Sequence, residues 1–494
     1  TTLSSASGIR LLATAGAAAP TYSIYAPGAG SAITLQSAPN QTADSEFRID
    51  STIFAAGNIT TQASPVGNTV SKLAVSASGK LESQSGNISA SGAESITVDG
   101  SLLASTGSIS VISTADTVVG STGQLNAQAA ISITAGADLQ VDGNLGGQTA
   151  PLSLTLQADS GTISVNPGTG RLSSARSVLM DGQTVHFDGV LQTAAGTADA
   201  DDYEVRVLAD SLRLTGSFTI NGSLEIRTTT TPEIYNFTAT AGGSSSRILL
   251  VSDADLNVGR LTQNSQSKWI AQTASLAAPR SVTLQAPTGV VVVNTGSALT
   301  STANNSTVSV TSAGVQVIGV LAAGAQVASD GTLAWTGTDG DISLVAGQIA
   351  LGGMGVCPCG IQRTRGGSVQ ASGDIVFRAT GDGPLSIISI NSLSFVGTLP
   401  DGSESLPVVS ATPSISLLSD GDMEILGMLD AGGAGGDLLL DASGAILIDS
   451  LVTASDALNI SSRLTTGTSI TVSQLTLWTN AQGQLLNENG RTID

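Results

Sequence analysis

Apolar and small polar residues alternate along this chain in short runs that recur in the same order. Residues 131–145 read ISITAGADLQVDGNL and residues 415–429 read ISLLSDGDMEILGML, which are two alternating segments separated by turn residues, then Gly, one residue and Leu. A period of two predicts short β-strands whose successive side chains point to opposite faces. The same order recurs at 88–102, 178–191, 248–261, 308–321 and 438–451, where Ser450 replaces the Gly.

A longer duplication indicates how these strands are arranged. Residues 154–168 (LTLQADSGTISVNPG) resemble residues 282–296 (VTLQAPTGVVVVNTG). No segment has the apolar stripe of a capped helix, and a short repeated unit is typical of a solenoid. The sequence therefore predicts an all-β fold, a parallel β-helix (β-solenoid) of about 20 coils with roughly 20–30 residues each. Glycine at the coil corners is expected to take positive φ.

The pattern divides the chain into two parts and marks two interruptions. Residues 1–65 follow the pattern poorly and are predicted to be an irregular or β-rich start of the solenoid, whereas residues 66–494 are predicted to form the parallel β-helix. Loop excursions are expected near 193–204 (TAAGTADADDYE) and 352–367 (GGMGVCPCGIQRTRGG). The chain begins TTLSSASG without Met, so it is expected to be a part of a longer precursor.

Composition narrows the kind of core and the partners. The 494 residues are 41% hydrophobic but only 3% aromatic, so the core is expected to be narrow and filled by Val, Ile, Leu and Ala. The formal net charge of −20 opposes contact with phosphate backbones, and no nucleic-acid partner is predicted. No apolar run reaches the ~18 residues of a membrane-spanning helix, so no membrane span is predicted.

Two stretches carry a likeness to a known family. VDGSLLASTGSISV at 98–111 and VIGVLAAGAQV at 317–327 resemble the repeats of filamentous-haemagglutinin-like bacterial surface exoproteins, and the likeness covers roughly residues 70–480. The resemblance implies a right-handed parallel β-helix that is exported by two-partner secretion. It also implies a location outside the cell or on its surface, and a role in adhesion, biofilm formation or contact-dependent antagonism.

Catalytic chemistry finds little support in the residue types. The single histidine, His186, lies in the alternating segment 184–188, which places Val185 and Phe187 inward and the imidazole outward. The acidic run Asp199, Asp201 and Asp202 lacks the basic partners that acid–base chemistry on polysaccharides needs. We expect a protein that is not an enzyme. A polysaccharide lyase or hydrolase of β-helix fold is the alternative.

Calcium is the one cofactor for which the sequence contains candidate ligands. Residues 432–440 (GGAGGDLLL) fit the nonapeptide repeat of calcium-binding β-rolls, with Asp437 at the acidic position and Asp441 directly after it. Asp420 and Asp422 are paired at another turn. Each of these aspartates is either an exposed corner residue or, where coils stack carboxylates together, a calcium ligand. No cofactor is predicted, and calcium at these positions is the alternative.

The excursion 352–367 contains the only basic, non-repetitive loop that the pattern isolates. Cys357 and Cys359 are spaced C-x-C and lack further ligands for zinc, which leaves a local disulfide or two free thiols. Arg363 and Arg365 follow in the same loop. These four residues are candidates for a contact with a partner.

The leading functional hypothesis is an extracellular structural or adhesive β-helical rod, a segment of a large bacterial surface exoprotein. Its Ser-, Thr- and Asn-rich surface would contact glycans or a matrix. Because the open ends of a β-helix expose unpaired strand edges, the chain is expected either to continue in a longer polypeptide or to join end to end as a homopolymer. A self-assembling filament or surface-layer subunit is therefore a second hypothesis.

Overall fold

The structure is a computed structural model, and two compact units divide the chain. Unit 1 is Thr1–Ile226 and unit 2 is Arg227–Asp494. Each unit is described on its own. The described residues are 3–4, 8–13, 24–37, 45–62, 71–148, 150–194, 203–265, 269–327, 333–356, 362–365, 367–380, 384–387, 408–410, 414–425, 427–431, 436–448, 452–462, 470–472, 478–479 and 485–486.

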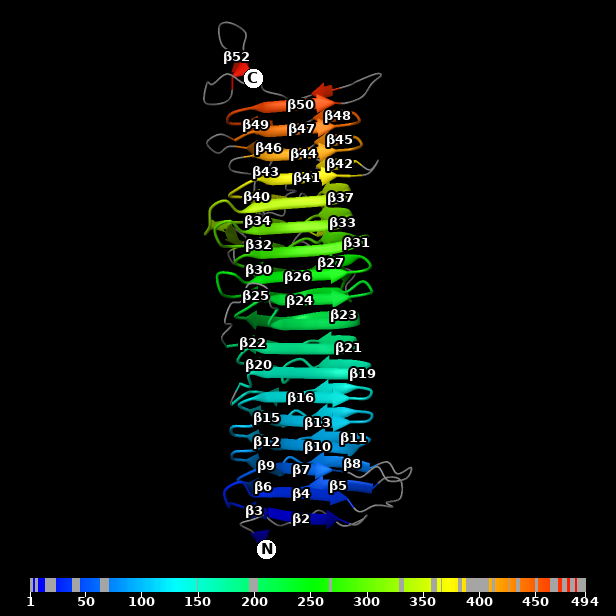
Figure 1. The fold of residues 1–494 in the computed structure, drawn as a ribbon. Helices are drawn as coiled ribbons and strands as arrows, with labels where there is room; N and C mark the ends of the chain where they lie inside the picture. Colours follow the sequence, from blue (N-terminus) through cyan, green and yellow to red (C-terminus); the bar gives the residue numbers. More distant parts are fainter. Residues whose placement is uncertain are drawn as a thin grey trace. The chain divides into compact units, whose positions relative to one another are not determined.

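The described residues form strands and turns and contain no helix. Strands of successive coils pair in parallel, and residues of like character meet across each pair. In unit 1, for example, Ile88 is paired with Ile109, and Ile109 with Ile131. The predicted all-β, parallel, β-solenoid-like fold is confirmed (Figure 1).

A coil of unit 1 has three strands, which define faces A, B and C in chain order. On face A lie β2 (Gly8–Ala13), β4 (Ala32–Ser37), β7 (Ile59–Gln62), β10 (Ile88–Ala93), β13 (Ile109–Ser113) and β16 (Ala130–Ala135). On face B lie β5 (Ser45–Ile49), β8 (Ser71–Val75), β11 (Ser95–Val98), β14 (Thr117–Val119) and β17 (Leu139–Val141). On face C lie β1 (Leu3–Ser4), β3 (Ile24–Ala26), β6 (Thr52–Ala55), β9 (Lys80–Ser83), β12 (Ser101–Ala104), β15 (Gln124–Ala127), β18 (Asn144–Leu145), β20 (Arg171–Ser174) and β22 (Val190–Thr193).

Three longer strands of unit 1 continue from one face to the next. β19 pairs with both β16 and β17, and β21 pairs with both parts of β19, so each covers faces A and B. β23 pairs with β21 and β22 and therefore reaches face C. Their bounds are β19 (Ser153–Val165), β21 (Ser177–Phe187) and β23 (Val205–Ile220), and β24 (Leu224–Thr228) follows at the boundary between the units.

Unit 2 repeats the three-strand coil. Faces A and B are formed by β26 (Arg247–Ser252), β27 (Leu256–Val258), β31 (Ser281–Val293), β33 (Thr307–Val317), β37 (Asp341–Leu351), β41 (Ile375–Ala379), β42 (Leu385–Ile387), β44 (Ile415–Ser419), β45 (Met423–Ile425), β47 (Leu438–Ala442), β48 (Ile446–Ile448), β50 (Leu458–Ser462) and β51 (Ile470–Val472). Face C is formed by β30 (Ala274–Ala278), β32 (Ala298–Ser301), β34 (Val320–Ala323), β40 (Ser368–Ala371), β43 (Val408–Ser410), β46 (Met428–Ala431) and β49 (Val452–Ala454), and β25 (Glu233–Ala241) spans faces B and C.

Among the described residues, four antiparallel strand pairs lie outside these coils, and all four are in unit 2. Each pair is a two-stranded sheet of its own. They are β28 (Arg260–Gln263) with β29 (Trp269–Gln272), β35 (Ala325–Val327) with β36 (Leu333–Trp335), β38 (Gly353–Val356) with β39 (Gln362–Arg365), and β52 (Trp478–Thr479) with β53 (Leu485–Leu486).

The core of each unit is a set of aliphatic columns. On face A of unit 1 the residues Ile88, Ile109, Ile131, Leu154 and Val178 stack in register and are at most 1% exposed. Full burial of one such side chain contributes about 1.5–3 kcal/mol relative to its exposure. Stacked aliphatic columns fill a narrow interior, which explains why the chain folds with few aromatic residues.

At two corners of unit 1, glycine is required by close packing between coils and not by the expected positive φ, which Gly259 at a corner of unit 2 does adopt (77°). A Cβ atom on Gly100 would lie 2.2 Å from the carbonyl oxygen of Gly79, and one on Gly143 would lie 2.3 Å from that of Gly123. Neither Gly100 nor Gly143 is among the glycines with positive φ. The prediction of positive φ at these corners is wrong, because the backbones of adjacent coils approach too closely there for any side chain.

Candidate functional site

Asn and Asp side chains at the coil corners of unit 1 bind the backbone of the next coil. At the corner that precedes face A, Asn58 Oδ1 accepts a hydrogen bond from the Asn87 N–H (2.8 Å), and Asn87 Oδ1 accepts one from the Ser108 N–H (2.8 Å). At the corner that precedes face B, Asp138 Oδ1 accepts one from the Thr162 N–H (2.7 Å). These oxygens satisfy backbone donors where the strand ladder is interrupted by the turn.

The aspartates predicted as calcium ligands have the same kind of contact in unit 2. Asp422 Oδ1 accepts from the Ala445 N–H (2.8 Å), and Asp437 Oδ1 accepts from the Ala457 N–H (3.2 Å). Residues 432–435, which precede Asp437 in the nonapeptide, lie outside the described residues. Asp422 and Asp437 therefore link adjacent coils through one carboxylate oxygen each.

The other two calcium candidates lie farther along the same coils. Asp441 Oδ1 accepts a hydrogen bond from the Ser461 hydroxyl (2.7 Å) on the outside of face A. Asp420 is exposed, and its N–H donates to the carbonyl oxygen of Ala379 (2.9 Å). Within the described ranges no three His, Cys, Asp or Glu side chains are grouped closely enough to hold a metal ion. Calcium binding at these aspartates stays a prediction.

Asp341 differs from these residues in its electrostatic environment. Burial raises the pKa of its carboxyl, and the nearby carboxylates of Asp374 and Asp339 raise it further. The Asp374 N–H donates to Asp341 Oδ1 (2.8 Å), and this hydrogen bond opposes the rise of the pKa. The corner before face A in this part of unit 2 thus holds a carboxylate that is less stable in its charged form than in water.

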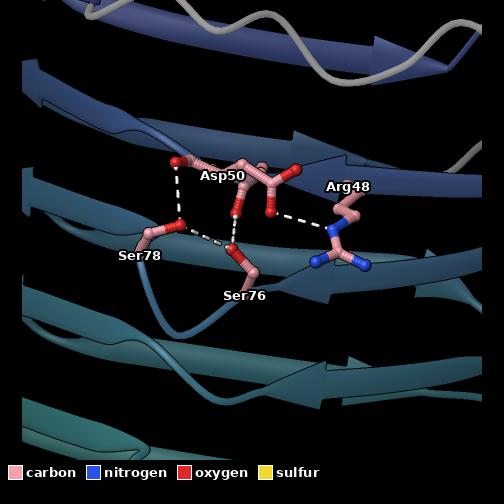
Figure 2. A network of polar contacts seen from close by, with 5 residues as sticks. Arg48, Asp50, Ser76 and Ser78 are labelled. Atoms are coloured by element: carbon pink, nitrogen blue, oxygen red, sulfur yellow. Dashed lines mark hydrogen bonds and ion pairs between the residues drawn. The ribbon is translucent and has the colours of Figure 1, made fainter.

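A polar network on the outside of unit 1 shows the opposite electrostatics (Figure 2). Arg48 Nε donates to Asp50 Oδ1 (2.8 Å), and the Ser78 hydroxyl of the next coil donates to the Asp50 carbonyl oxygen (3.1 Å). The Ser76 hydroxyl lies 3.2 Å from that of Ser78. Hydrogen bonding from Ser76, followed by that from Arg48, lowers the pKa of Asp50, and the hydrogen bond to Asp50 raises the pKa of Arg48.

His186 lies on face B of unit 1 with its neighbours as the alternation predicts. Val185 and Phe187 are 0% exposed, whereas His186 is half-buried on the outside. In the adjacent coil Arg213 is its register partner, and the Arg213 Nη2 atom donates to Asp188 Oδ2 (2.9 Å). The inward and outward assignment is confirmed. Asp199, Asp201 and Asp202 lie outside the described residues.

The predicted partner loop corresponds to an antiparallel strand pair. β38 and β39 pair so that Arg365 lies opposite Gly353 and Arg363 opposite Gly355. Cys357 and Cys359 fall between the two strands and outside the described residues. β38 also contacts β29, so two of the antiparallel pairs of unit 2 touch one another.

Sequence reasoning missed the residues on the β28–β29 pair. The Arg260 guanidinium lies 3.5 Å from the ring centre of Tyr235, and its Nε atom donates to Gln272 Oε1 (2.5 Å). Glu233 Oε1 is 3.6 Å from Arg260 Nη1. Ile270 is 43% exposed on the same pair. This aromatic and cationic cluster joins the β28–β29 pair to β25 of the coil.

Tryptophan was the signal that would have located these elements. The chain has three tryptophans, and all of them lie in strands of antiparallel pairs: Trp269 in β29, Trp335 in β36 and Trp478 in β52. Trp335 is 51% exposed. Phe187 and Phe377 are buried within coils, whereas each tryptophan lies in a segment that leaves the stack.

The fold and these contacts define the class as an all-β, parallel, β-solenoid-like protein. A comparison with protein-family models, with curated proteins and with solved structures finds no match to the chain. In the part of the chain that the structure describes, no helix has the length and hydrophobicity needed to cross a membrane.

Proposed function

We propose that this chain is a non-enzymatic structural or adhesive element, a right-handed β-helical rod of about 20 coils that acts outside the cell or at its surface. The proposal includes the role of a segment in a larger bacterial exoprotein like those that its repeats resemble. The observation that carries it is the separate placement of the polar residues that link coils and of the tryptophans. Corner Asn and Asp residues link adjacent coils by hydrogen bonds, while the three tryptophans lie on strand pairs that leave the coils.

The outward columns support a wettable, contact-forming surface. On face A of unit 1, Ser89, Ser110, Ser132 and Thr155 lie in one register column. Hydroxyl groups at the ~4.8 Å spacing of adjacent strands offer repeated donors and acceptors to a glycan or matrix. Exposed aromatic rings such as Trp335 add an apolar surface for the ring faces of sugars.

Binding of the full chain to immobilised glycans and matrix proteins tests the adhesive role. Trp335→Ala and Trp269→Ala are expected to weaken binding, each about fivefold, since an aromatic contact contributes on the order of 1 kcal/mol. Tyr25→Ala is the matched control, because Tyr25 is an exposed aromatic (37%) within a coil. Equal binding by all three variants would contradict the adhesive role.

The enzymatic alternative is tested on the same materials. Incubation of the chain with acidic and neutral polysaccharides is expected to release no reducing or unsaturated ends. Their appearance, together with loss on Asp188→Asn but not on Asp441→Asn, would replace the structural function with a lyase or hydrolase activity on face B.

End-to-end assembly is a second candidate function, and one observation favours it. Leu438 and Leu440 on face A are 0% exposed, whereas their register partners Leu458 and Ile460 in β50 are half-exposed. Inward aliphatic residues that lack full cover are a surface on which another coil can stack. The coil would come from a second copy of the chain or from a continuation of the same polypeptide.

Analytical ultracentrifugation and electron microscopy over a range of concentrations test self-assembly. The chain is expected to form end-to-end oligomers, which Leu458→Lys disrupts and Asn459→Lys, at the adjacent outward position, does not. Monodisperse single chains at every concentration would contradict homopolymer formation and leave the continuing polypeptide as the occupant of this surface.

A further inference from the structure

One position of the coil in unit 1 shows a regular charge alternation. It is the position directly after the strand of face B, and the preceding residues stack in register from Ile49 to Leu214. A carboxylate occurs there in every second coil, and a neutral residue in every other one. We call this set the Asp column: Asp50, Ser76, Asp99, Gly120, Asp142, Asn166, Asp188 and Thr215.

The neutral residue of the next coil binds the carboxylate at several steps of the column. Asn166 Nδ2 donates to Asp142 Oδ1 (2.5 Å), and the Thr215 hydroxyl donates to Asp188 Oδ1. The Ser76 hydroxyl donates to the Ile49 carbonyl oxygen directly before Asp50 (3.3 Å), and hydrogen bonding from Ser76 lowers the pKa of Asp50. Each of these donors lies one coil beyond its acceptor, so the hydrogen bonds connect adjacent coils.

A glycine takes the place of the donor above Asp99. A Cβ atom on Gly120 would lie 1.9 Å from Asp99 Oδ1, so the carboxylate occupies the space that a side chain would need. The carboxylate of Asp99 therefore requires a residue without a side chain at this position of the following coil. Whether it is a hydrogen-bond donor or a glycine, the residue of the Asp column in the coil after each carboxylate is uncharged.

Nearby groups on face B complete the surroundings of the carboxylates. Gln140 Nε2 donates to Asp142 Oδ2 (2.7 Å), two residues before it in the same strand and turn. Asp50 receives Arg48 Nε, and Asp188 receives Arg213 Nη2. The other ionisable groups on the strands of face B beside these carboxylates are Glu46 and Lys72, which are register partners, and His186.

The spacing has a simple electrostatic consequence. Neighbouring strands lie ~4.8 Å apart, so a carboxylate in every coil would place like charges within direct repulsion distance. Carboxylates in every second coil are about 9.6 Å apart, close to the distance over which physiological salt screens exposed charges. The column thus keeps its charge without stacking carboxylate on carboxylate.

The same position lacks this arrangement in the coils of unit 2 from β27 to β37. The residues that follow β27, β31, β33 and β37 are Gly259, Asn294, Ile318 and Gly352, none of which is acidic. Asn294 Nδ2 donates to the Gly259 carbonyl oxygen (2.8 Å), which is a neutral version of the contact between Asn166 and Asp142. Alternation of charge is therefore a property of unit 1 and not a requirement of the coil.

We propose that the Asp column is an electrostatic register device, which permits adjacent coils of unit 1 to stack only where a carboxylate meets an uncharged residue. It makes the stability of the coil–coil contacts in unit 1 depend on the charge of this one position. The coils of unit 2 from β27 to β37, whose residues at this position are uncharged, have no such dependence. This property is independent of what the rod binds.

Asparagine to aspartate substitutions at matched positions test the device. Asn166→Asp places carboxylates in three successive coils, whereas Asn294→Asp places one between Gly259 and Ile318. Both substitutions remove one amide donor. Hydrogen exchange at pH 7 is expected to accelerate about tenfold or more in β17, β19 and β21 of Asn166→Asp, and much less in β27, β31 and β33 of Asn294→Asp.

Charge and hydrogen bonding are separated by two further variants. Asn166→Ala removes the donor without adding charge and is expected to accelerate exchange less than Asn166→Asp. The triple variant Asp142→Asn, Asn166→Asp, Asp188→Asn restores an isolated carboxylate and is expected to return exchange to within about twofold of the unchanged chain. Addition of 1 M NaCl is expected to reduce the effect of Asn166→Asp, because salt screens exposed charges.

Three outcomes would overturn the proposal. They are equal acceleration in Asn166→Asp and Asn294→Asp, equal acceleration in Asn166→Ala and Asn166→Asp, and failure of the triple variant to recover. If Asn166→Asp does not fold while the triple variant does, the proposal is upheld, because the triple variant contains the same substitution with its two acidic neighbours removed.

Discussion

Unit 1 and unit 2 build the same three-strand coil but use its corners differently. In unit 1 the register joins Ile88 to Ile109 and Ile109 to Ile131, so these coils have 21 and 22 residues. In unit 2 coil length varies more: Ile342 to Ile375 and Ile375 to Ile415 give coils of 33 and 40 residues, whereas Ile415 to Leu438 gives one of 23. The longer coils exceed the expected 20–30 residues.

The two units therefore differ in how their sequences vary outside the core. Short coils leave little chain at the corners, so unit 1 varies single residues there, as in the Asp column. Long coils leave room for inserted segments, and the four antiparallel pairs, with all three tryptophans, lie in unit 2. Both units have the same kind of aliphatic core. The alternating carboxylates of the Asp column occur in unit 1, whereas the protruding strand pairs occur in unit 2.

Truncation of a core side chain is expected to have the largest effect on the free energy of unfolding, and a similar effect in the two units. Leu156 and Leu284 occupy the same place in the duplicated segment and are both 0% exposed. Replacement of either by Ala is expected to lower the free energy of unfolding of its unit by about 2–5 kcal/mol, because a cavity remains in the column. Denaturant unfolding followed by hydrogen exchange measures both.

Thr155→Ala and Thr283→Ala, at the adjacent outward positions, are the controls for core truncation. They are expected to change stability by less than about 0.5 kcal/mol. A much smaller loss for one leucine than for the other would show that the two units differ in core packing as well as at their corners.

Corner glycines come next in expected effect. Gly100→Ala in unit 1 and Gly319→Ala in unit 2 place a Cβ atom 2.2 Å and 2.4 Å from a backbone oxygen of another coil. Each is expected to cost about 1–3 kcal/mol of unfolding free energy. Gly147→Ala is the control, since its nearest neighbour is at 3.4 Å, and a loss there as large as at Gly100 would remove close packing as the cause.

Corner asparagines are expected to contribute less. Asn87→Ala in unit 1 and Asn304→Ala in unit 2 each leave a backbone N–H of the next coil, that of Ser108 or Thr338, without its acceptor. The expected loss is about 1 kcal/mol in either unit. Asn87→Asp keeps the acceptor, and thermal unfolding should show it to be more stable than Asn87→Ala. The reverse order would contradict the role of Oδ1.

The smallest expected effects have opposite signs in the two units. The pKa of Asp50 is lowered from 3.8, so its charged form stabilises unit 1 above that value, and this stability is lost as the pH falls through the pKa of the folded state. The pKa of Asp341 is raised from 3.8, so its charged form costs unit 2 stability at neutral pH, and protonation on acidification relieves that cost.

Asp50→Asn is therefore expected to lower slightly, and Asp341→Asn to raise slightly, the unfolding midpoint at pH 7. The difference for Asp341→Asn should disappear near pH 3, because its raised pKa leaves the carboxyl protonated there, whereas the difference for Asp50→Asn should decrease only as the pH falls through the lowered pKa of Asp50. Thermal unfolding of the two variants at pH 7 and pH 3 measures this. Shifts of the same sign at pH 7 would contradict the opposite electrostatics of Asp50 and Asp341.

The alternation of side chains predicted much of the fold. In 184–188 it assigned Val185 and Phe187 to the interior correctly, because strand geometry sends successive side chains to opposite faces whatever the partner strand is. It did not predict why glycine lies at position 100, since that depends on the distance to the backbone of another coil. It also left Asp422 and Asp437 as either exposed corner residues or calcium ligands, and did not predict their contacts with Ala445 and Ala457.

The sequence by itself determined the strands, their inward aliphatic columns and the parallel stacking of coils. These depend on local alternation and on a repeated pattern. Only the tertiary structure decided which polar residues meet. Asp142 and Asn166 are 24 residues apart, and Asp255 and Val290 are 35 apart, so their contacts depend on the length of each coil. Coil length is set by corners and inserted segments, where the alternation carries no information.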